Sequence, residues 1–356
     1  MDEIAFNTIR VIFLAVVGFI SAFLVTPLVA KLIEKYALKK QLRTHNSAPI
    51  YHSFHKNKQG TPTMGGVIIW GTVISLSVIF FILNYFGFSL GSYFNIIDRK
   101  ETYLPLATLF FAGILGLFDD LLGVYKIGPK GGGLSILQKI FLYLAIASIG
   151  AWWFYYKLGF DLLLIPFSNY FMNSGPIYIG LWYIPFFIFV IVASAFSANE
   201  TDGLDGLLGG VSLFAFGALT VIAFTLGKFN LAGFSAIVTG SLLAFLWFNI
   251  YPARFFMGDT GSMAIGITLG VMAMLTNTTI FLPFLVPIFI IESLSVIVQM
   301  ISKKIRGKKI FLSTPIHHHF EALGWHESKI TMRFWIISAV GSGLGLALFF
   351  LSQIIP

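Results

Sequence analysis

The sequence contains no cysteine and few charged residues. The absence of cysteine excludes a disulfide scaffold, a cysteine-ligated zinc or iron–sulfur site and thiol catalysis. Only 11% of the 356 residues are charged, against about a quarter in soluble domains. In contrast, 57% of the residues are hydrophobic and the mean hydropathy is +0.87. This composition predicts a membrane protein that forms a single integral-membrane domain over residues 1–356, with little chain left for a soluble domain.

The sequence also has no repeat of fixed period and no short alternating segments of the kind that form outer-membrane barrels. Its apolar runs are long and uniform, and at about 20 residues per crossing they fill about ten helices. Asp2 and Glu3 precede the first run without a basic region, so we expect no cleaved signal peptide. The pattern predicts an all-α polytopic membrane protein with spans near 8–33, 63–87, 103–122, 135–156, 176–198, 204–226, 230–250, 262–277, 280–302 and 331–353.

The basic residues are distributed unevenly between the loops. If the spans alternate across the bilayer, the loops at 31–62, 123–139, 251–261 and 303–333 share one side and hold 18 of the 23 lysines and arginines. The positive-inside rule then places these loops in the cytoplasm and both termini outside. The excess positive charge therefore needs no nucleic-acid partner. All seven histidines fall in the same loops, which favours chemistry at the cytoplasmic face.

Two adjacent acids, Asp119 and Asp120, close the third span in the motif GLFDDLLG. The C-terminal end of a helix carries partial negative charge, so two carboxylates there call for a cation, either a bound metal or a lysine. Two solvated acids at a helix end are the alternative. An all-carboxylate site suits Mg²⁺ better than Ca²⁺ or zinc. Other acids within or at the ends of apolar runs, where a carboxylate is a functional hypothesis, are Glu200, Asp202, Asp205, Asp259 and Glu292.

Two glycine-rich segments carry further acids. In NETDGLDGLLGG, Asp202 and Asp205 are three residues apart and would share one helical face, although N-capping could explain one of them. In FMGDTGS, Asp259 lies in a turn before the eighth span, where a helix N-terminus would offer free N–H groups to a phosphate. These motifs predict an anion-binding or metal-binding region.

The remaining polar motifs are less specific. KNKQGTPTMGG reads as the start of the second span, with Lys58 just outside it. GPKGGG lacks the phosphate-binding loop pattern, and PIHHHFEALGWHE lacks the HExxH pattern of zinc hydrolases. Its three consecutive histidines point in different directions, so at most two should converge on a phosphate, and all three could be solvated. Glu292 and Gln299 could form a polar seam between helices.

Together these features predict a cytoplasm-facing site with several carboxylates, helix N-termini and basic donors. Such an arrangement suits phosphoryl transfer to a lipid carrier at the inner leaflet. A secondary transporter is the rival class, but its acids should lie near mid-membrane in paired repeats. Here the acids cluster at one face and no repeat is present.

The motifs GTPTMGG, FDD, N-x-TDGLDG, FMGDTGS and PIHHHFE, followed by GW-x-E and RFWI, give the chain a family resemblance. It resembles the phospho-N-acetylmuramoyl-pentapeptide transferases, a branch of the polyprenyl-phosphate sugar-1-phosphate transferases. The resemblance implies ten transmembrane helices in the bacterial cytoplasmic membrane, with both termini outside. It implies attack of undecaprenyl phosphate on UDP-MurNAc-pentapeptide with Mg²⁺ on the pyrophosphate, giving lipid I and UMP, and it leaves a homodimer open.

The resemblance also implies roles for individual residues. Asp259 would ligate Mg²⁺, Asp119 would deprotonate the lipid phosphate or keep it ionised, and Asp120 would assist metal or phosphate placement, so both are further candidate metal ligands. A covalent role for an Asp is the alternative, which a ping-pong exchange test would detect. Phe256 matches an aromatic that stacks on uracil. Other nucleotide-pocket positions are Lys58, Thr63, Asn199, Asp202, Gly203, Leu204 and Asp205, and His318 and His319 match substrate-binding histidines.

The chain departs from the family pattern at two places. Phe196 and Glu200 replace a common Asn and Leu before GLDG, and the loop GVYKIGPKGGGLSILQK is less basic than usual. Neither change alters Asp119, Asp120 or Asp259. The alternative within the superfamily is a UDP-GlcNAc:polyprenyl-phosphate GlcNAc-1-phosphate transferase, against which the block from PIHHHFE to RFWI argues.

Overall fold

The computed structural model describes residues 3–35, 60–98, 101–129, 132–167 and 176–354. Among these residues, eight helices are long and apolar enough to cross a membrane, or nine if one bent pair is counted as a single span. The prediction of an all-α multi-pass membrane protein is confirmed. The eight are α1 (Glu3–Lys35), α3 (Val67–Tyr85), α5 (Tyr103–Val124), α6 (Ile136–Trp152, extended by a π-helical turn, Trp153–Lys157), α8 (Tyr183–Thr201, preceded by the 3₁₀ turn Gly180–Trp182), α9 (Leu207–Thr225), α10 (Phe229–Asn249) and α15 (Glu327–Ile354).

Short elements connect these helices. The strands β1 (Leu162–Leu163) and β2 (Ile177–Tyr178) pair antiparallel with Leu162 opposite Tyr178, and they are the only strands in the described part of the chain. The other elements are α4 (Ser89–Phe94), α11 (Asp259–Leu275), a 3₁₀ turn (Thr279–Phe281), α12 (Leu282–Leu285), α13 (Pro287–Arg306) and α14 (Ile316–Ala322).

All ten predicted spans coincide with helical segments, but two of them are not simple crossings. The 17 residues of α11 extend about 25 Å, less than the roughly 30 Å of a hydrocarbon core. Every residue from Thr260 to Leu275 is buried by neighbouring helices. The predicted span at 280–302 is broken, because α12 and α13 meet at 89°. Against the predicted number of about ten, the described residues thus hold eight helices of the length and apolarity of a span, or nine with the bent pair.

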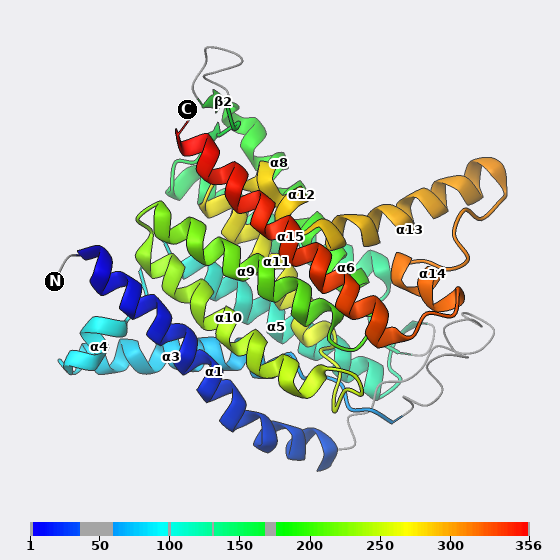
Figure 1. Ribbon diagram of the computed structural model, residues 1–356, viewed down its shortest axis with the longest axis horizontal. Coiled ribbons are helices and arrows are strands. Elements are labelled where there is room, and N and C mark those ends of the chain that lie inside the picture. Colours follow the sequence, from blue (N-terminus) through cyan, green and yellow to red (C-terminus); the bar gives the residue numbers. More distant parts are fainter. Residues whose placement is uncertain (1–2, 36–59, 99–100, 130–131, 168–175, 355–356) are drawn as a thin grey trace.

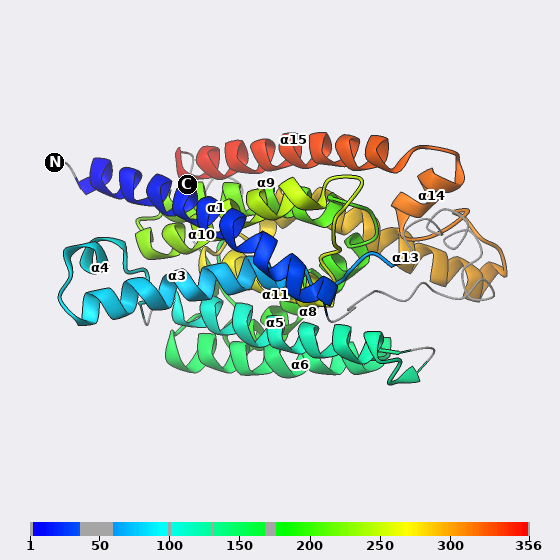
Figure 2. The ribbon, with the colours of Figure 1, turned by 90° about the horizontal axis from the view of Figure 1, so that it is seen from below.

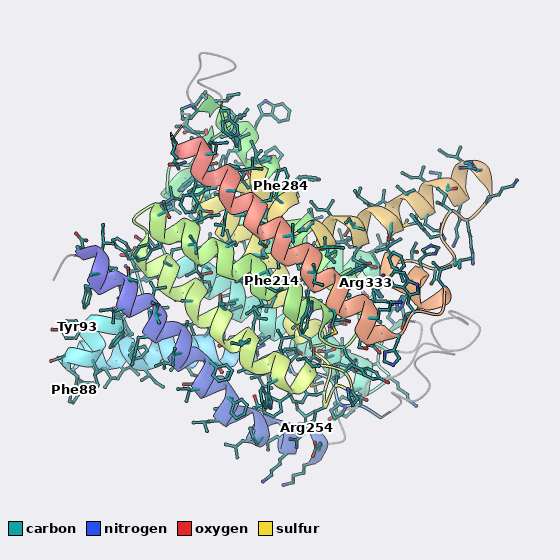
Figure 3. All side chains as sticks on the ribbon, in the orientation of Figure 1. Phe88, Tyr93, Phe214, Arg254, Phe284 and Arg333 are labelled. Carbon is teal, nitrogen blue, oxygen red and sulfur yellow. The ribbon has the colours of Figure 1, made fainter. Side chains whose placement is uncertain are left out.

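The helices form a bundle with α15 at one side and α6 at the other, as Figure 2 shows. α11 lies between these layers and contacts α5, α8, α9 and α3. The start of α1 and the end of α15 lie at one end of the bundle, and α14 lies at the opposite end. Large apolar side chains cover the outside of the molecule, among them Phe88, Tyr93 and Phe284 (Figure 3). An apolar exterior is the expected surface of a protein that lipid surrounds.

One glycine determines how closely α5 approaches α11. A Cβ atom on Gly116 would overlap the backbone carbonyl oxygen of Asp259 at the start of α11. The helices can therefore meet here only because residue 116 has no side chain. This contact brings the C-terminal end of α5, with its two acids, beside the N-terminal end of α11.

Candidate active site

Two carboxylates from distant parts of the sequence share one lysine. The Lys139 Nζ atom, from the first turn of α6, lies 2.7 Å from Asp119 Oδ2 and 2.7 Å from Asp259 Oδ2. Asp119 belongs to the last two turns of α5 and is only 2% exposed, and Asp259 is the first residue of α11. The structure thus brings Asp119 and Asp259 together, and the cation that compensates the acids is a lysine.

Sequence reasoning counted Lys139 only as a loop charge and missed this contact. Ser135 and Gln138 form a capping box that starts α6, so Lys139 belongs to the first helical turn. The backbone N–H of Leu134, just before the cap, donates to Asp119 Oδ1. The signal that could have revealed the lysine is its position inside an apolar run, the criterion already applied to the acids.

Asp120 has different partners from Asp119. Its Oδ2 atom accepts hydrogen bonds from the Thr260 backbone N–H (3.0 Å) and from the Thr260 hydroxyl (2.7 Å). Its Oδ1 atom lies 3.5 Å from the Thr63 hydroxyl. A carboxylate at a helix N-terminus is favoured by the helix dipole. Asp120 therefore stabilises the start of α11 as well as lying beside the other acids.

Four of the N–H groups expected to be free at the start of α11 are occupied. The Gly258 N–H donates to Asp202 Oδ2 (3.1 Å), and the Thr260 N–H is taken by Asp120. The N–H groups of Gly261 and Ser262 both donate to the carbonyl of Gly258. Carboxylates from α5 and from the end of α8 thus occupy the donors that the motif FMGDTGS offers.

α8 also contributes Asn199, one of the predicted site residues. Its Nδ2 group donates to Asp259 Oδ1 and lies 3.2 Å from the Ser262 hydroxyl. Together with the Lys139 contact to Oδ2, this leaves both oxygens of Asp259 bonded to fixed donors. Asp259 is therefore held in one orientation by α6 and α8.

Asp202 and Asp205 do not share a helical face as the sequence predicted. Asp202 is the C-cap of α8, and α9 starts only at Leu207, after Gly206 with a φ of 74°. Glycine is favoured at such a left-handed position, so the intervening residues form a turn instead of a helix. In this turn Leu204 is buried, and Asp205 accepts a hydrogen bond from the Ala253 N–H at 3.0 Å.

Further contacts tie this turn to α15, and others tie Phe256 to the segment before α3. The Asp205 N–H donates to Glu327 Oε1 at 2.5 Å, and the Thr331 hydroxyl donates to the Asp205 carbonyl at 3.2 Å. The Phe256 N–H donates to the carbonyl of Pro62 at 2.8 Å, next to the buried Thr63. Phe256 itself is partly exposed. Lys58 lies outside the described residues.

The three histidines of α14 point in different directions, as predicted. His318 Nδ1 lies 2.6 Å from Glu321 Oε2, and His319 Nδ1 accepts a hydrogen bond from the Leu312 N–H at 3.2 Å. His317, which was not among the predicted site residues, is fully buried. It packs so closely on Gly203 that a Cβ atom there would overlap its Nε2 atom. The histidine that reaches the Asp202–Asp205 turn is therefore His317.

His317 forms a buried pair with Glu292 of α13, since its Nδ1 atom lies 3.0 Å from Glu292 Oε1. Burial lowers the pKa of His317, but Glu292 first, and then Glu321 and Glu200, raise it, so the net direction is upward. The hydroxyls of Ser293 and Ser197 lie 2.7 Å apart next to this pair. The predicted polar seam on α13 thus exists, with Ser293 contacting α8 and Glu292 contacting α14.

This pair should make the stability of the protein depend on pH. A histidine whose pKa is higher in the folded than in the unfolded state stabilises the fold fully below the unfolded pKa, near 6.5, and loses that contribution as the pH rises through the folded pKa. We expect the midpoint temperature of thermal inactivation to be lower at pH 9 than at pH 6. In Glu292→Gln this difference should shrink, and the midpoint at pH 6 should fall by several degrees, because a buried charge loses its partner.

The control is Glu34→Gln, which removes the acid of an exposed pair with Arg254 at 3.4 Å. Its midpoint should match that of the wild type at both values of pH, since exposed pairs contribute little. An unchanged pH dependence in Glu292→Gln would show that His317 is not charged in the folded protein.

The fold and the site define a class of protein: an all-helical, multi-pass membrane protein in which carboxylates from α5 and α11 share one lysine. Residues 102–277, which contain Asp119, Asp120 and Asp259, match the family model described as glycosyl transferase family 4. Residues 58–69 match the phospho-N-acetylmuramoyl-pentapeptide-transferase signature 1.

Curated relatives specify the family. A phospho-N-acetylmuramoyl-pentapeptide-transferase of Clostridium novyi (strain NT) is 37% identical over 331 residues, covering 92% of this chain and 94% of the relative. Proteins of the same name from Anoxybacillus flavithermus and Chloroflexus aurantiacus are 34% and 35% identical, over 94% and 95% of this chain and 97% and 89% of the relatives. The chain belongs to the phospho-N-acetylmuramoyl-pentapeptide-transferase family and is a phosphoglycosyl transferase.

Proposed function

We propose that the protein transfers phospho-MurNAc-pentapeptide from UDP-MurNAc-pentapeptide to undecaprenyl phosphate, giving lipid I and UMP. The observation that carries the proposal is the Asp119–Lys139–Asp259 bridge, which gathers two carboxylates and an ammonium at one end of a lipid-embedded bundle. Opposite charges in one small site suit a reaction in which a phosphate and a pyrophosphate must meet.

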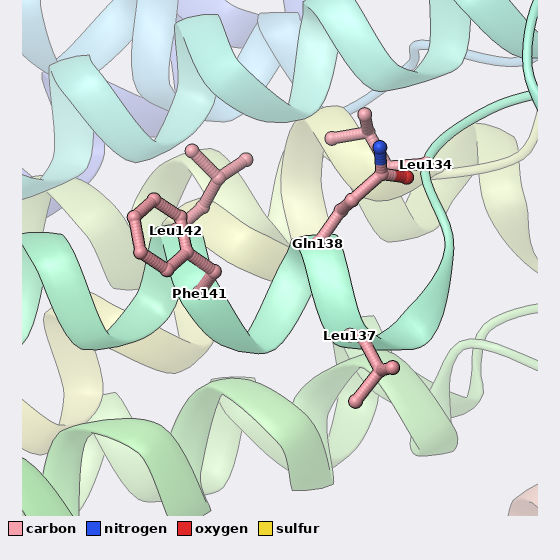
Figure 4. Close-up of a pocket in the computed structure, with 5 residues that line it drawn as sticks. All are labelled: Leu134, Leu137, Gln138, Phe141 and Leu142. Atoms are coloured by element: carbon pink, nitrogen blue, oxygen red, sulfur yellow. The ribbon is translucent and has the colours of Figure 1, made fainter.

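An apolar groove beside the bridge supports a lipid acceptor. It has a volume of about 360 Å³ and is lined by Leu134, Leu137, Gln138, Phe141 and Leu142 (Figure 4). Lys139 follows Gln138 directly, and the Leu134 N–H is bonded to Asp119. A polyprenyl chain in this groove would place its phosphate beside Asp119 and Lys139.

The residues present fit a magnesium ion. Mg²⁺ prefers oxygen ligands and is commonly bound by one or two carboxylates together with substrate phosphates and water. The Lys139 Nζ atom lies 2.7 Å from a carboxylate oxygen of each of Asp119 and Asp259, so a single cation can contact both side chains. Among the described residues no three His, Cys, Asp or Glu side chains form a metal-binding group, so the substrate would supply the other ligands. Asp259 would hold the ion, with Asp119 beside it, and the ion would neutralise charge on the pyrophosphate.

Each side chain then has a defined task. Asp119 accepts the proton of the lipid phosphate, or keeps that phosphate ionised, so that one of its oxygens can attack the β-phosphorus of the nucleotide. The bond between the β-phosphorus and the bridging oxygen breaks, and the electron pair leaves with UMP. Lys139 donates to phosphate oxygens, and Asn199 holds the orientation of Asp259. Asp120 maintains the start of α11 through Thr260.

The distribution of charge supports a site that faces the cytoplasm of a bacterial inner membrane. The basic residues of α13 and of the segment after it precede α14, which lies at the end of the bundle opposite the start of α1. Basic loops remain on the cytoplasmic side during insertion. Both termini would then face outward.

The proposal is tested with the purified full-length protein in detergent, given undecaprenyl phosphate and either UDP-MurNAc-pentapeptide or UDP-GlcNAc. We expect UMP and lipid I to form only with the first nucleotide, and only when Mg²⁺ is present. Asp259→Ala should abolish this release. Turnover of UDP-GlcNAc would favour the GlcNAc-1-phosphate transferase, and equal release by the variant would contradict the assignment of the metal to Asp259.

A further inference from the structure

α13 has its polar face turned toward the protein and its apolar face turned outward. Its buried residues include Glu292, Ser295, Gln299 and Ser302. Its exposed residues are large and apolar, and Ile305 is 77% and Met300 65% exposed. In a membrane protein, lipid acyl chains are the expected neighbours of such a surface. The other apolar residues on this face are Ile291, Leu294, Ile297, Val298 and Ile301.

α13 also differs from the long helices in direction. It follows α12 at an angle of 89°, and Figure 1 shows its end projecting outward from the long helices. The segment after α13 belongs to one of the basic loops that the positive-inside rule places at the cytoplasmic surface, so the end of α13 lies where headgroups can reach it.

Five cations gather at this end of α13. Lys303, Lys304 and Arg306 occupy its last turn, and Lys308 and Lys309 follow Gly307. We call these five residues the basic tip. All five are exposed, and in the part of the chain that the structure describes none of them lies within 4 Å of an acid. The chain has no Asp or Glu between Glu292 and Glu321.

The segment after α13 is fixed against the helix. The buried Gln299 donates from Nε2 to the Phe311 carbonyl at 2.9 Å and accepts at Oε1 from the N–H groups of Ile310 (2.9 Å) and Phe311 (3.1 Å). The Ser302 hydroxyl donates to the Lys308 carbonyl at 2.9 Å. These bonds keep Lys308 and Lys309 close to the last turn of the helix, so the five cations form one surface.

We propose that the basic tip is a docking site for the headgroups of anionic phospholipids, whose acyl chains cover the apolar face of α13. Lysine and arginine donate charge-assisted hydrogen bonds to phosphate oxygens. Clusters of four to eight such residues at a membrane surface are typical of binding to anionic lipids. The lipid is a structural ligand here, so the proposal does not depend on the identity of the reaction.

The test compares lipid retention by the purified full-length protein. The protein is equilibrated in detergent with equal amounts of phosphatidylglycerol and phosphatidylcholine, and bound lipid is counted by native mass spectrometry. We expect the wild type to retain at least about five times more phosphatidylglycerol than phosphatidylcholine. A variant with all five cations of the basic tip changed to Gln should retain the two lipids equally.

Three further variants separate the site from general charge and from misfolding. Lys308→Gln with Lys309→Gln should lower the preference at least about twofold, whereas Lys31→Gln with Lys126→Gln removes the same charge elsewhere and should leave it unchanged. A variant with the four lysines of the tip changed to Arg should behave like the wild type. Equal retention of both lipids by the wild type, or equal losses in the two double variants, would overturn the proposal. Binding of a second protein to the tip, unaffected by either lipid, would also overturn it.

Discussion

Asp259→Asn and Asp119→Asn are each expected to lower turnover at least about a hundredfold. This is the lower range for the loss of an acid–base or metal-binding group. Asp259→Asn keeps the shape of the side chain but removes the charge that faces Lys139 at 2.7 Å. Asp119→Asn removes the group that would accept the proton of the lipid phosphate. The measurement is the initial rate of UMP release at saturating concentrations of both substrates.

The matched control is Asp161→Asn, which changes an acid next to β1, far along the chain from the three site acids. Its turnover should stay within about twofold of the wild type. Thermal midpoints of all three variants show whether a loss of rate reflects misfolding. Near-normal turnover in Asp119→Asn or in Asp259→Asn would remove that residue from the mechanism.

Lys139→Met should have an effect of similar size on turnover, because it keeps an apolar stem of similar length but removes the shared ammonium. Asp119 and Asp259 would then face each other without a cation, and like charges at close range repel. We therefore expect the thermal midpoint in EDTA to fall below that of the wild type by several degrees. Added Mg²⁺ should raise the midpoint of the variant more than that of the wild type, because the ion can take the place of the ammonium.

Lys126→Met serves as the control, since Lys126 is exposed and lies 13 residues earlier in the same region of the chain. It should leave both turnover and midpoint unchanged. If Lys139→Met also behaved like the wild type in EDTA, the bridge would have no part in stability. If Mg²⁺ stabilised both proteins equally, the two carboxylates would not be the place where the ion binds.

The sequence predicted the helices well because long apolar runs need lipid or protein around them. It could not distinguish these two surroundings, so α11 was predicted to be an ordinary span. Side chains such as Ile265 and Leu269 are apolar in either case, and only the structure shows that other helices bury them. The break before α13 had a visible signal in Pro287, which is favoured at the first position of a helix.

The site was predicted in part. Asp119 and Asp259 were predicted to belong to one site because the acids cluster at one face, and the structure brings them to one lysine. Lys139 was missed because its charge was assigned to a loop before the start of α6 was known. His317 was missed because the direction of each of three adjacent histidines depends on the rotation of α14. That rotation is set by the buried contact with Glu292, which lies 25 residues earlier.

The complete enclosure of α11 affects how the protein can be made. The four helices that surround it, α3, α5, α8 and α9, all precede it in the chain, so they have been synthesised when α11 leaves the ribosome. A short, glycine-containing helix with no lipid-facing side can be accommodated once those neighbours have assembled around its place. Asp259, at the head of α11, is then the last of the three site acids to enter, and the site is completed only after most of the bundle has been inserted.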